Sequence, residues 1–264
     1  MYVLLKGLSL LLILFTPWSA RAESQKPQQS PVIALLAAYP NFLDRLDGNE
    51  IVWKDGTRMT VDDGKKGEAL ESMLDDPDIK DMFIMPYPAG DRWDAPAVDF
   101  DPGRIRYMPL FKKMYGDCQT TNLATGLENV TWLPTKFGKP VRFSKINGAA
   151  AALHTVSEEL DKLSDQFLDY LRPPAGTFNC RPIAGTTQVS AHGLGIAIDI
   201  ALKYSDYWLW TKPAPKDGTI LYKNRIPAEI VQIFEKHGFI WGGKWYHYDT
   251  MHFEYRPELL SSSK

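Results

Sequence analysis

The chain has 264 residues, of which 44% are hydrophobic and 23% are charged, and such a chain can bury a full core as one large domain or as one domain with an extension. Its formal net charge is only -2. Because binding to nucleic acid depends on clustered Lys and Arg, we expect no nucleic-acid ligand.

Residues 1-22 have the features of a secretory signal peptide. Lys6 supplies the positive start, residues 8-15 form an apolar run, and Ala20-Arg21-Ala22 has the A-x-A cleavage pattern. The run is shorter than the roughly 20 residues that span a bilayer. We therefore expect a secreted, periplasmic protein without stable membrane insertion after cleavage, with an uncleaved anchor as the alternative. The polar residues 23-30 are expected to form a flexible linker.

Residues 31-103 are expected to form an N-terminal extension or subdomain. Apolar residues between 31 and 46 predict a helix that is interrupted near Pro40. Asp55-Gly56 lies between two short apolar runs, which predicts a β-hairpin. Asp62-Asp63-Gly64 resembles part of a calcium loop, but the remaining spaced ligands are missing, so we interpret it as a turn or a helix start.

Residues 104-260 are expected to form the main domain. Short strands are expected near 130-134 and 141-143. Apolar residues then recur at every third or fourth position and predict one long amphipathic helix over residues 147-171: Leu153, Val156, Leu160, Leu163, Phe167 and Leu171. A further helix is expected over 226-238, between an early Pro and a final Gly, and a strand follows it.

Two apolar strands carry polar side chains that require an explanation. Asp199 interrupts the apolar alternation of residues 188-201, and an unpaired charge there would be costly, so it should be paired, hydrogen-bonded or bound to a metal. His192 precedes it, and a second strand at 248-255 carries His252 and Glu254. Pairing these strands would bring two imidazoles and a carboxylate together. Such a set leaves one coordination position open, which is typical of catalytic zinc.

The pattern Ser190-x-His192-x-x-Gly195-x-Ala197-x-Asp199, followed by Asp249-x-x-His252, resembles the zinc D-alanyl-D-alanine carboxypeptidase/dipeptidase family. That family includes vancomycin-resistance enzymes and some phage L-alanyl-D-glutamate endopeptidases. The resemblance covers roughly residues 177-257. It implies that His192, Asp199 and His252 bind zinc and that Asp249 is the catalytic base, although many members have Glu at that position.

Four further residues are candidates for a role in the site. Arg181 resembles the arginine that family members place upstream of the metal motif, where it would stabilise an oxyanion or bind a substrate carboxylate; a solvent-exposed ion pair is the alternative. Ser190 would bond the site or the substrate, or simply end a strand. Glu254 would orient a ligand imidazole, or pair with Arg256. His247 would replace a ligand or steady the transition state, or lie in an aromatic loop.

The chain has two cysteines, Cys118 and Cys180. Export makes a disulfide between them possible, and it would close a loop of about 60 residues, worth about 4 kcal/mol in the chain-entropy model. The alternative is that Cys180, which lies near the metal motif in sequence, is a soft metal ligand.

Together these observations predict an α+β fold with a mainly antiparallel sheet and flanking helices, of the hedgehog/DD-peptidase type that the resemblance implies. The implied reaction is zinc-dependent hydrolysis of an amide in peptidoglycan stem peptides, first as a D-Ala-D-Ala carboxypeptidase. The alternatives are an L-Ala-D-Glu endopeptidase and a non-catalytic zinc-containing module that binds the cell wall. A non-metal hydrolase is disfavoured, because the chain has no Gly-x-Ser-x-Gly pattern.

Overall fold

The computed structural model describes residues 30-65, 70-120, 123-183, 188-210 and 219-261. The predicted signal peptide and all but the last residue of the predicted linker lie outside this part of the chain. Within it, no helix combines the length and the apolar character that crossing a membrane requires.

The N-terminal part contains an antiparallel sheet in the order β1-β2-β3, with β1 at Leu43–Asp47, β2 at Glu50–Trp53 and β3 at Arg58–Thr60. The predicted hairpin is confirmed, and Gly56 takes a φ of +82° in its turn, a region that favours glycine.

The helix predicted over residues 31-46 is shorter than expected. Helix α1 spans Pro31–Ala38 and ends before Pro40, and residues 43-47 form β1. A proline cannot donate the helical hydrogen bond and clashes with the preceding turn, so the chain leaves the helix there.

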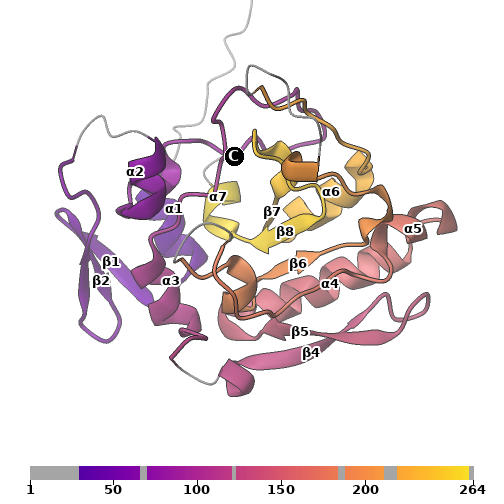
Figure 1. The fold of residues 1–264 in the computed structure, drawn as a ribbon. Helices are drawn as coiled ribbons and strands as arrows, with labels where there is room; N and C mark the ends of the chain where they lie inside the picture. The colour runs from indigo at the N-terminus through magenta and orange to yellow at the C-terminus, as the bar shows by residue number, and fades with distance from the viewer. Residues whose placement is uncertain (1–29, 66–69, 121–122, 184–187, 211–218, 262–264) are drawn as a thin grey trace, which may run out of the picture.

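The next segment has little regular structure. Helix α2 at Leu70–Asp75 precedes a long connection, and helix α3 at Met108–Tyr115 follows it. In Figure 1 this connection leaves α2, passes over the top of the molecule and returns to α3.

A second hairpin consists of β4 (Leu127–Trp132) and β5 (Lys139–Ser144). Helix α4 (Ala149–Asp161) lies between this hairpin and strand β6 (Figure 1). The single helix predicted over 147-171 is wrong: the chain leaves α4 at Lys162, takes an extended conformation at Ser164, and forms a short helix α5 at Leu168–Leu171. Serine favours such a helix start, and the new direction still buries Leu168 and Leu171.

The third sheet has the order β6-β8-β7, with antiparallel pairs throughout. Strand β6 spans Ala197–Asp199, β7 spans Phe239–Trp241 and β8 spans His252–Tyr255, and two helices accompany them, α6 (Ala228–Lys236) and α7 (Pro257–Ser261). The predicted α+β class with antiparallel pairing and flanking helices is confirmed, although the strands form three small sheets.

The apolar stretch 188-201 is not one strand. Its first half forms a 3-10 turn at Ala191–Leu194, and only residues 197-199 pair as β6. The Ser190 side chain caps this turn, and Gly195 ends it with a φ of +71°. Serine at a helix start and glycine at its end favour a turn over extended structure.

One continuous cluster of buried apolar residues runs through the described chain. It includes Ile51 and Trp53 from the N-terminal sheet as well as Ile198 and Phe253 from the third sheet. Residues on both sides of position 103 therefore contribute to the same core, while the division into an extension and a main domain stays a prediction.

Candidate metal centre and active site

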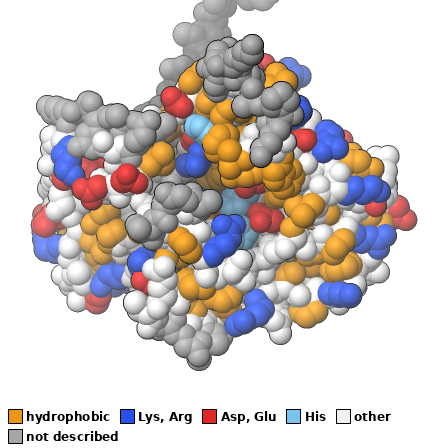
Figure 2. Space-filling view, in the orientation of Figure 1, with side chains coloured by type: hydrophobic (Ala, Val, Ile, Leu, Met, Phe, Trp, Pro, Cys, Tyr) orange, Lys and Arg blue, Asp and Glu red, His pale blue; other side chains and the backbone are white. Residues whose placement is uncertain are grey.

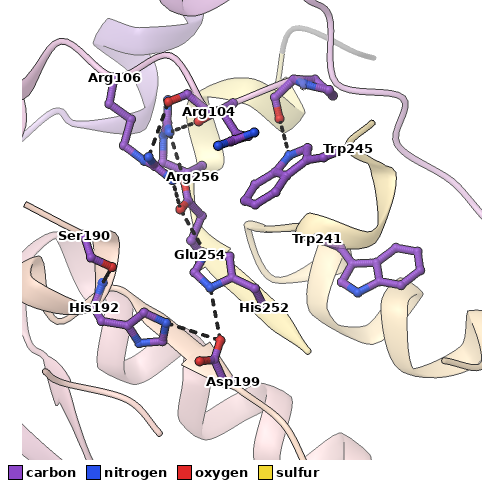
Figure 3. Close-up of polar contacts among 12 residues, drawn as sticks. Arg104, Arg106, Ser190, His192, Asp199, Trp241, Trp245, His252, Glu254 and Arg256 are labelled. Atoms are coloured by element: carbon purple, nitrogen blue, oxygen red, sulfur yellow. Dashed lines mark hydrogen bonds and ion pairs between the residues drawn. The ribbon is translucent and has the colours of Figure 1, made fainter. Parts of the chain in front are cut away.

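Strand pairing brings the predicted ligand side chains together. Asp199 and His252 are direct partners across β6 and β8, and the 3-10 turn before β6 carries His192. Asp199 Oδ1 lies 3.2 Å from His192 Nε2 and 3.1 Å from His252 Nδ1 (Figure 3). One potential ligand atom from each residue lies within 4.8 Å of the other two.

The turn fixes the orientation of the His192 ring. The backbone N–H of His192 donates to Ser190 Oγ at 3.3 Å, and His192 Nδ1 lies 2.7 Å from the carbonyl oxygen of Thr177. Because a carbonyl can only accept, Nδ1 carries a proton, and Nε2 is the nitrogen that faces Asp199.

His252 lies between two carboxylates. Its Nε2 lies 3.2 Å from Glu254 Oε2, on the side opposite Asp199. Burial alone would lower the pKa of His252, but its contacts with Asp199 and Glu254 outweigh burial and raise the pKa to about 10. Burial likewise opposes the charge of Asp199, yet its contacts with the two histidines hold the pKa of that carboxyl well below its usual value.

Glu254 is fully buried and is neutralised by two arginines. Arg106 donates to both of its oxygens, at 3.1 and 2.5 Å, and Arg256 Nη1 donates to Oε1 at 3.0 Å. The charges of Arg106 and Arg256, with the hydrogen bond to His252, outweigh burial and keep the pKa of Glu254 well below its usual value. Glu254 therefore contacts both of its predicted partners, the imidazole of His252 and the guanidinium of Arg256.

The donor chemistry of this group fits zinc. Two imidazole nitrogens and one carboxylate oxygen are the ligands of open, catalytic zinc sites, and hydrogen bonds from a second layer of residues usually orient such ligands. The carbonyl of Thr177 orients His192, and Glu254 contacts His252.

A second group of possible ligands, Asp62, Asp63 and Asp78, lies far along the chain from this site. Its carboxylates are engaged by the protein itself: Asp78 accepts the N–H of Asp63, and Lys65 and Lys80 pair with Asp63 and Asp62. These contacts agree with the interpretation of this segment as a turn.

Asp249 lies in the turn that enters β8 and is outside the three-residue ligand group. Its Oδ1 atom is buried and has no hydrogen-bond partner among the described residues. Burial, together with the charge of Asp199, raises the pKa of Asp249 to about 6, while the charge of His252 opposes this shift. A carboxyl group that titrates close to neutral pH suits a general base.

Asp249 and the two histidines open into a pocket of about 90 Å³. Figure 2 shows acidic, basic and histidine side chains meeting at a hollow in the middle of this face. The pocket is lined by Arg104, Arg106, Arg181, Ile183, Ser190, Ala191, His192, Trp245, Asp249 and His252. Of the predicted substrate-binding residues, Ser190 is buried, and Arg181 is exposed with no side-chain hydrogen bond to the rest of the described chain.

His247 is oriented by a different partner. Asp101 accepts the backbone N–H of His247 at 2.9 Å and lies 2.6 Å from His247 Nδ1, and the Trp208 ring packs edge-on against the imidazole. His247 is not part of the ligand group found among the described residues.

Sequence reasoning missed Asp101, Arg104 and Arg106, which belong to what we call the 101–106 segment. Hydrogen bonds join this segment to the elements that carry the site. Asp101 accepts from His247, Pro102 O accepts from Trp245 Nε1, and Gly103 O accepts from Arg256 Nη1. Arg106 donates to Glu254. The only signal in the sequence is the alternation of charged and apolar residues after Gly103, which says nothing about a partner so far along the chain.

Cys118 and Cys180 form a disulfide, with 5.8 Å between their Cα atoms. The alternative of Cys180 as a metal ligand is therefore wrong, because neither sulfur is free to bind metal. The bond joins the chain that follows α3 to the chain just before Arg181.

Comparison with known proteins agrees with this geometry. Residues 184–255 match a family described as D-alanyl-D-alanine carboxypeptidase, which confirms the resemblance expected from the sequence. The matched segment contains the three candidate ligands and Asp249, whereas Arg104, Arg106 and Arg181 lie outside it. No curated protein and no solved structure matches the chain significantly.

Proposed function

We propose that this chain, with its similarity to D-alanyl-D-alanine carboxypeptidases over residues 184–255, is a zinc peptidase that removes a C-terminal D-alanine from peptidoglycan stem peptides. The proposal includes a DD-peptidase type of fold for the catalytic part and a periplasmic or secreted location, which the disulfide supports.

The observation that carries the proposal is Asp249. A structural metal site with three ligands has no use for an additional carboxyl group that has an unpartnered buried oxygen and a pKa raised to about 6. A hydrolase needs such a base beside its metal. This favours an enzyme over a non-catalytic module that only binds the wall.

The roles of the residues follow from their surroundings. Zinc held by His192, Asp199 and His252 would supply Lewis-acid chemistry, which polarises a carbonyl and makes water acidic enough to react near neutral pH. Asp249 accepts the proton of the attacking water and then donates it to the leaving amine nitrogen. Arg181 stabilises the negative charge that develops on the carbonyl oxygen. Ser190 holds the backbone of His192, and Glu254 holds the ring of His252.

The first prediction concerns the metal. We expect the purified protein to contain about one zinc per chain, and we expect His192→Ala and His252→Ala to lose it, since each removes one of three ligands. His154→Ala is the matched control, because His154 is exposed on α4 and its ion pair among the described residues is with Glu158, outside the site. Metal analysis after dialysis measures this, and full zinc occupancy in His252→Ala would reject the ligand set.

The second prediction concerns catalysis. Asp249→Asn keeps the size of the side chain but cannot accept a proton, so turnover should fall roughly 10²-fold or more while zinc is retained. Asp249→Glu should keep part of the activity. The assay digests purified muropeptides and weighs the products, which also separates loss of a terminal D-alanine from cleavage at the L-Ala-D-Glu bond.

Two outcomes would contradict this role of Asp249. Loss of zinc from Asp249→Asn would make the residue a fourth ligand and the site a closed, structural one. Hydrolysis at the wild-type rate would place the base elsewhere, with His247 and Glu254 as the next candidates.

A further inference from the structure

The catalytic pocket is lined by three arginines, and their charges are not equally available. Arg106 is buried and ion-paired with Glu254, to which it donates two hydrogen bonds. Arg181 is exposed and has no ion pair in the described part of the chain. Arg104 lies between these extremes, with 26% of its side chain exposed.

Arg104 is anchored through a single ion pair, with Asp101. Its Nη1 donates to Asp101 Oδ2 at 3.0 Å, and its guanidinium lies 6.0 Å from the centre of the Trp245 ring (Figure 3). Asp101 is shared, because the same oxygen lies 2.6 Å from His247 Nδ1. Within the described residues this is the only side-chain hydrogen bond of Arg104, so most of its five N–H donors remain available to a ligand.

The 101–106 segment is held in place on both sides of Arg104. Pro102 O accepts from Trp245 Nε1 and Gly103 O accepts from Arg256 Nη1, so the residues on one side of Arg104 are bonded to the site. On the other side, Arg106 is bonded to Glu254. A guanidinium held in this way loses little freedom when it binds a ligand, which strengthens binding.

The pocket restricts the ligand. Its volume is small, about 90 Å³, which suits a compact anionic group such as a carboxylate. Arginine binds planar carboxylates through two parallel hydrogen bonds. Because Asp249 and the two histidines line the same pocket, an anion on Arg104 would lie beside the amide that they act on.

We infer that Arg104 is the residue that binds the free terminal carboxylate of the peptide. The inference rests on the proposed function and deepens it. It divides the work between two arginines: Arg104 binds the carboxylate, and Arg181 acts on the carbonyl oxygen. It also makes the segment outside the family match a determinant of substrate choice.

The test compares a peptide acid with its amide. The zinc-loaded full chain is assayed with diacetyl-L-lysyl-D-alanyl-D-alanine and with the same tripeptide as its C-terminal amide. Arg104→Met should raise KM for the acid at least about tenfold, the scale of a charge-assisted pair, with little change in kcat and little effect on the amide. Arg104→Lys should restore part of the loss. Arg45→Met, on an exposed strand far from the pocket, is the control.

Three results would overturn the inference. Arg104→Met could leave the kinetics on the acid unchanged, or it could lower activity equally on acid and amide. Alternatively, Arg181→Met instead of Arg104→Met could be the variant that loses the preference for the acid. Zinc content and melting temperature are measured for every variant, so that a folding defect is recognised as such. If the wild type hydrolyses neither peptide, the proposed function fails. The role of Arg104 is then tested by ligand binding instead of by kinetics. Calorimetry with D-alanyl-D-alanine and its amide should then show a preference for the acid that Arg104→Met abolishes. Equal binding of both by the wild type would reject the carboxylate site by itself.

Discussion

Asp249 occupies surroundings that oppose its charge. Burial and the neighbouring Asp199 raise its pKa to about 6, whereas the usual value in an unfolded chain is about 4. Between these two pH values the folded protein binds the proton more tightly than the unfolded chain does. The free energy of unfolding therefore falls as pH rises through this window, and the full penalty is present above it.

The third prediction follows from this sign. In the metal-free protein, Asp249→Asn should be more stable than the wild type at about pH 7.5, by on the order of 1–3 kcal/mol, and the difference should vanish below about pH 4. Thermal unfolding in the presence of a chelator measures it at both pH values.

Asp101→Asn serves as the contrasting control. Burial alone would raise the pKa of Asp101, but the hydrogen bond with His247 and the charge of Arg104 outweigh it and hold the pKa below its usual value. Its ionised form therefore stabilises the fold, and Asp101→Asn should be less stable than the wild type at neutral pH. Equal stability of wild type and Asp249→Asn across the whole range would show that Asp249 is not strained by its surroundings.

Residue types predicted part of the site. A carboxylate in an apolar stretch, and histidines placed where strand pairing could bring them close to it, predicted the group His192, Asp199 and His252. The structure brings these three side chains together. Their role as zinc ligands stays a proposal. Asp101, Arg104 and Arg106 could not be predicted, because their function depends on packing against residues about 150 positions away along the chain.

At the scale of elements, local turn signals predicted a hairpin correctly, whereas long apolar patterns predicted single elements where the structure has two. The Asp55-Gly56 turn is a local feature and appears as expected. The apolar pattern over 147-171 fits one long helix and two shorter helices that bury the same face equally well. The extended conformation at Ser164 divides the segment into two helices. The stretch 188-201 is apolar because it is buried, so its composition does not distinguish a strand from the turn that carries His192.

The 101–106 segment depends on a glycine. Gly103 has a φ of +91°, and a Cβ atom there would lie 2.5 Å from Ile240 Cδ1 and 2.9 Å from Leu259 Cδ1. Ile240 is in β7 and Leu259 is in α7, so the segment lies directly against both elements. A side chain at position 103 would therefore force Ile240, Leu259 or the segment itself to shift, in addition to the strain of the positive φ.

The fourth prediction tests this close contact. Gly103→Ala should destabilise the protein by several kcal/mol, from backbone strain of about 1–2 kcal/mol and from the clash in addition. Gly56→Ala is the matched control, because Gly56 also has a positive φ, of +82°, but nothing lies within 4 Å of its Cβ position. Chemical unfolding measures both. Equal losses in the two variants would show that the segment moves without cost and that contact with β7 and α7 does not hold it.

At the scale of the whole molecule, buried charges connect the N-terminal helix to the site. Tyr39, just after α1, donates to Glu258 at 2.6 Å, Glu258 pairs with Arg256, and Arg256 pairs with Glu254, which contacts His252. Removing one member would leave its buried partner uncompensated, which is strongly destabilising. A continuous chain of buried polar contacts therefore joins the end of the first described helix to a candidate zinc ligand, a relation that no local pattern in the sequence indicates.

The disulfide is a second link between distant parts of the chain. Cys118 follows α3, and Cys180 lies 62 residues later, just before Arg181. The Cys118 sulfur lies only 3.1 Å from the position that a Cβ on Gly193 would take, so the bond lies directly against the turn that carries His192. It can act in two ways, by restricting the unfolded chain or by holding that turn in place.

The fifth prediction separates these two effects. In the chain-entropy model a closed loop of this length contributes about 4 kcal/mol, so the double variant Cys118→Ala/Cys180→Ala should melt roughly 8–16 °C below the wild type, given about 2–4 °C per kcal/mol for a chain of this size. Since this effect acts on the unfolded chain, the folded variant at low temperature should still bind zinc as the wild type does. Wild-type protein treated with a reductant should melt at the same temperature as the variant. Loss of zinc at a temperature where the variant is fully folded would instead show that the bond positions His192, because the ligand turn then depends on the sulfur packed against Gly193.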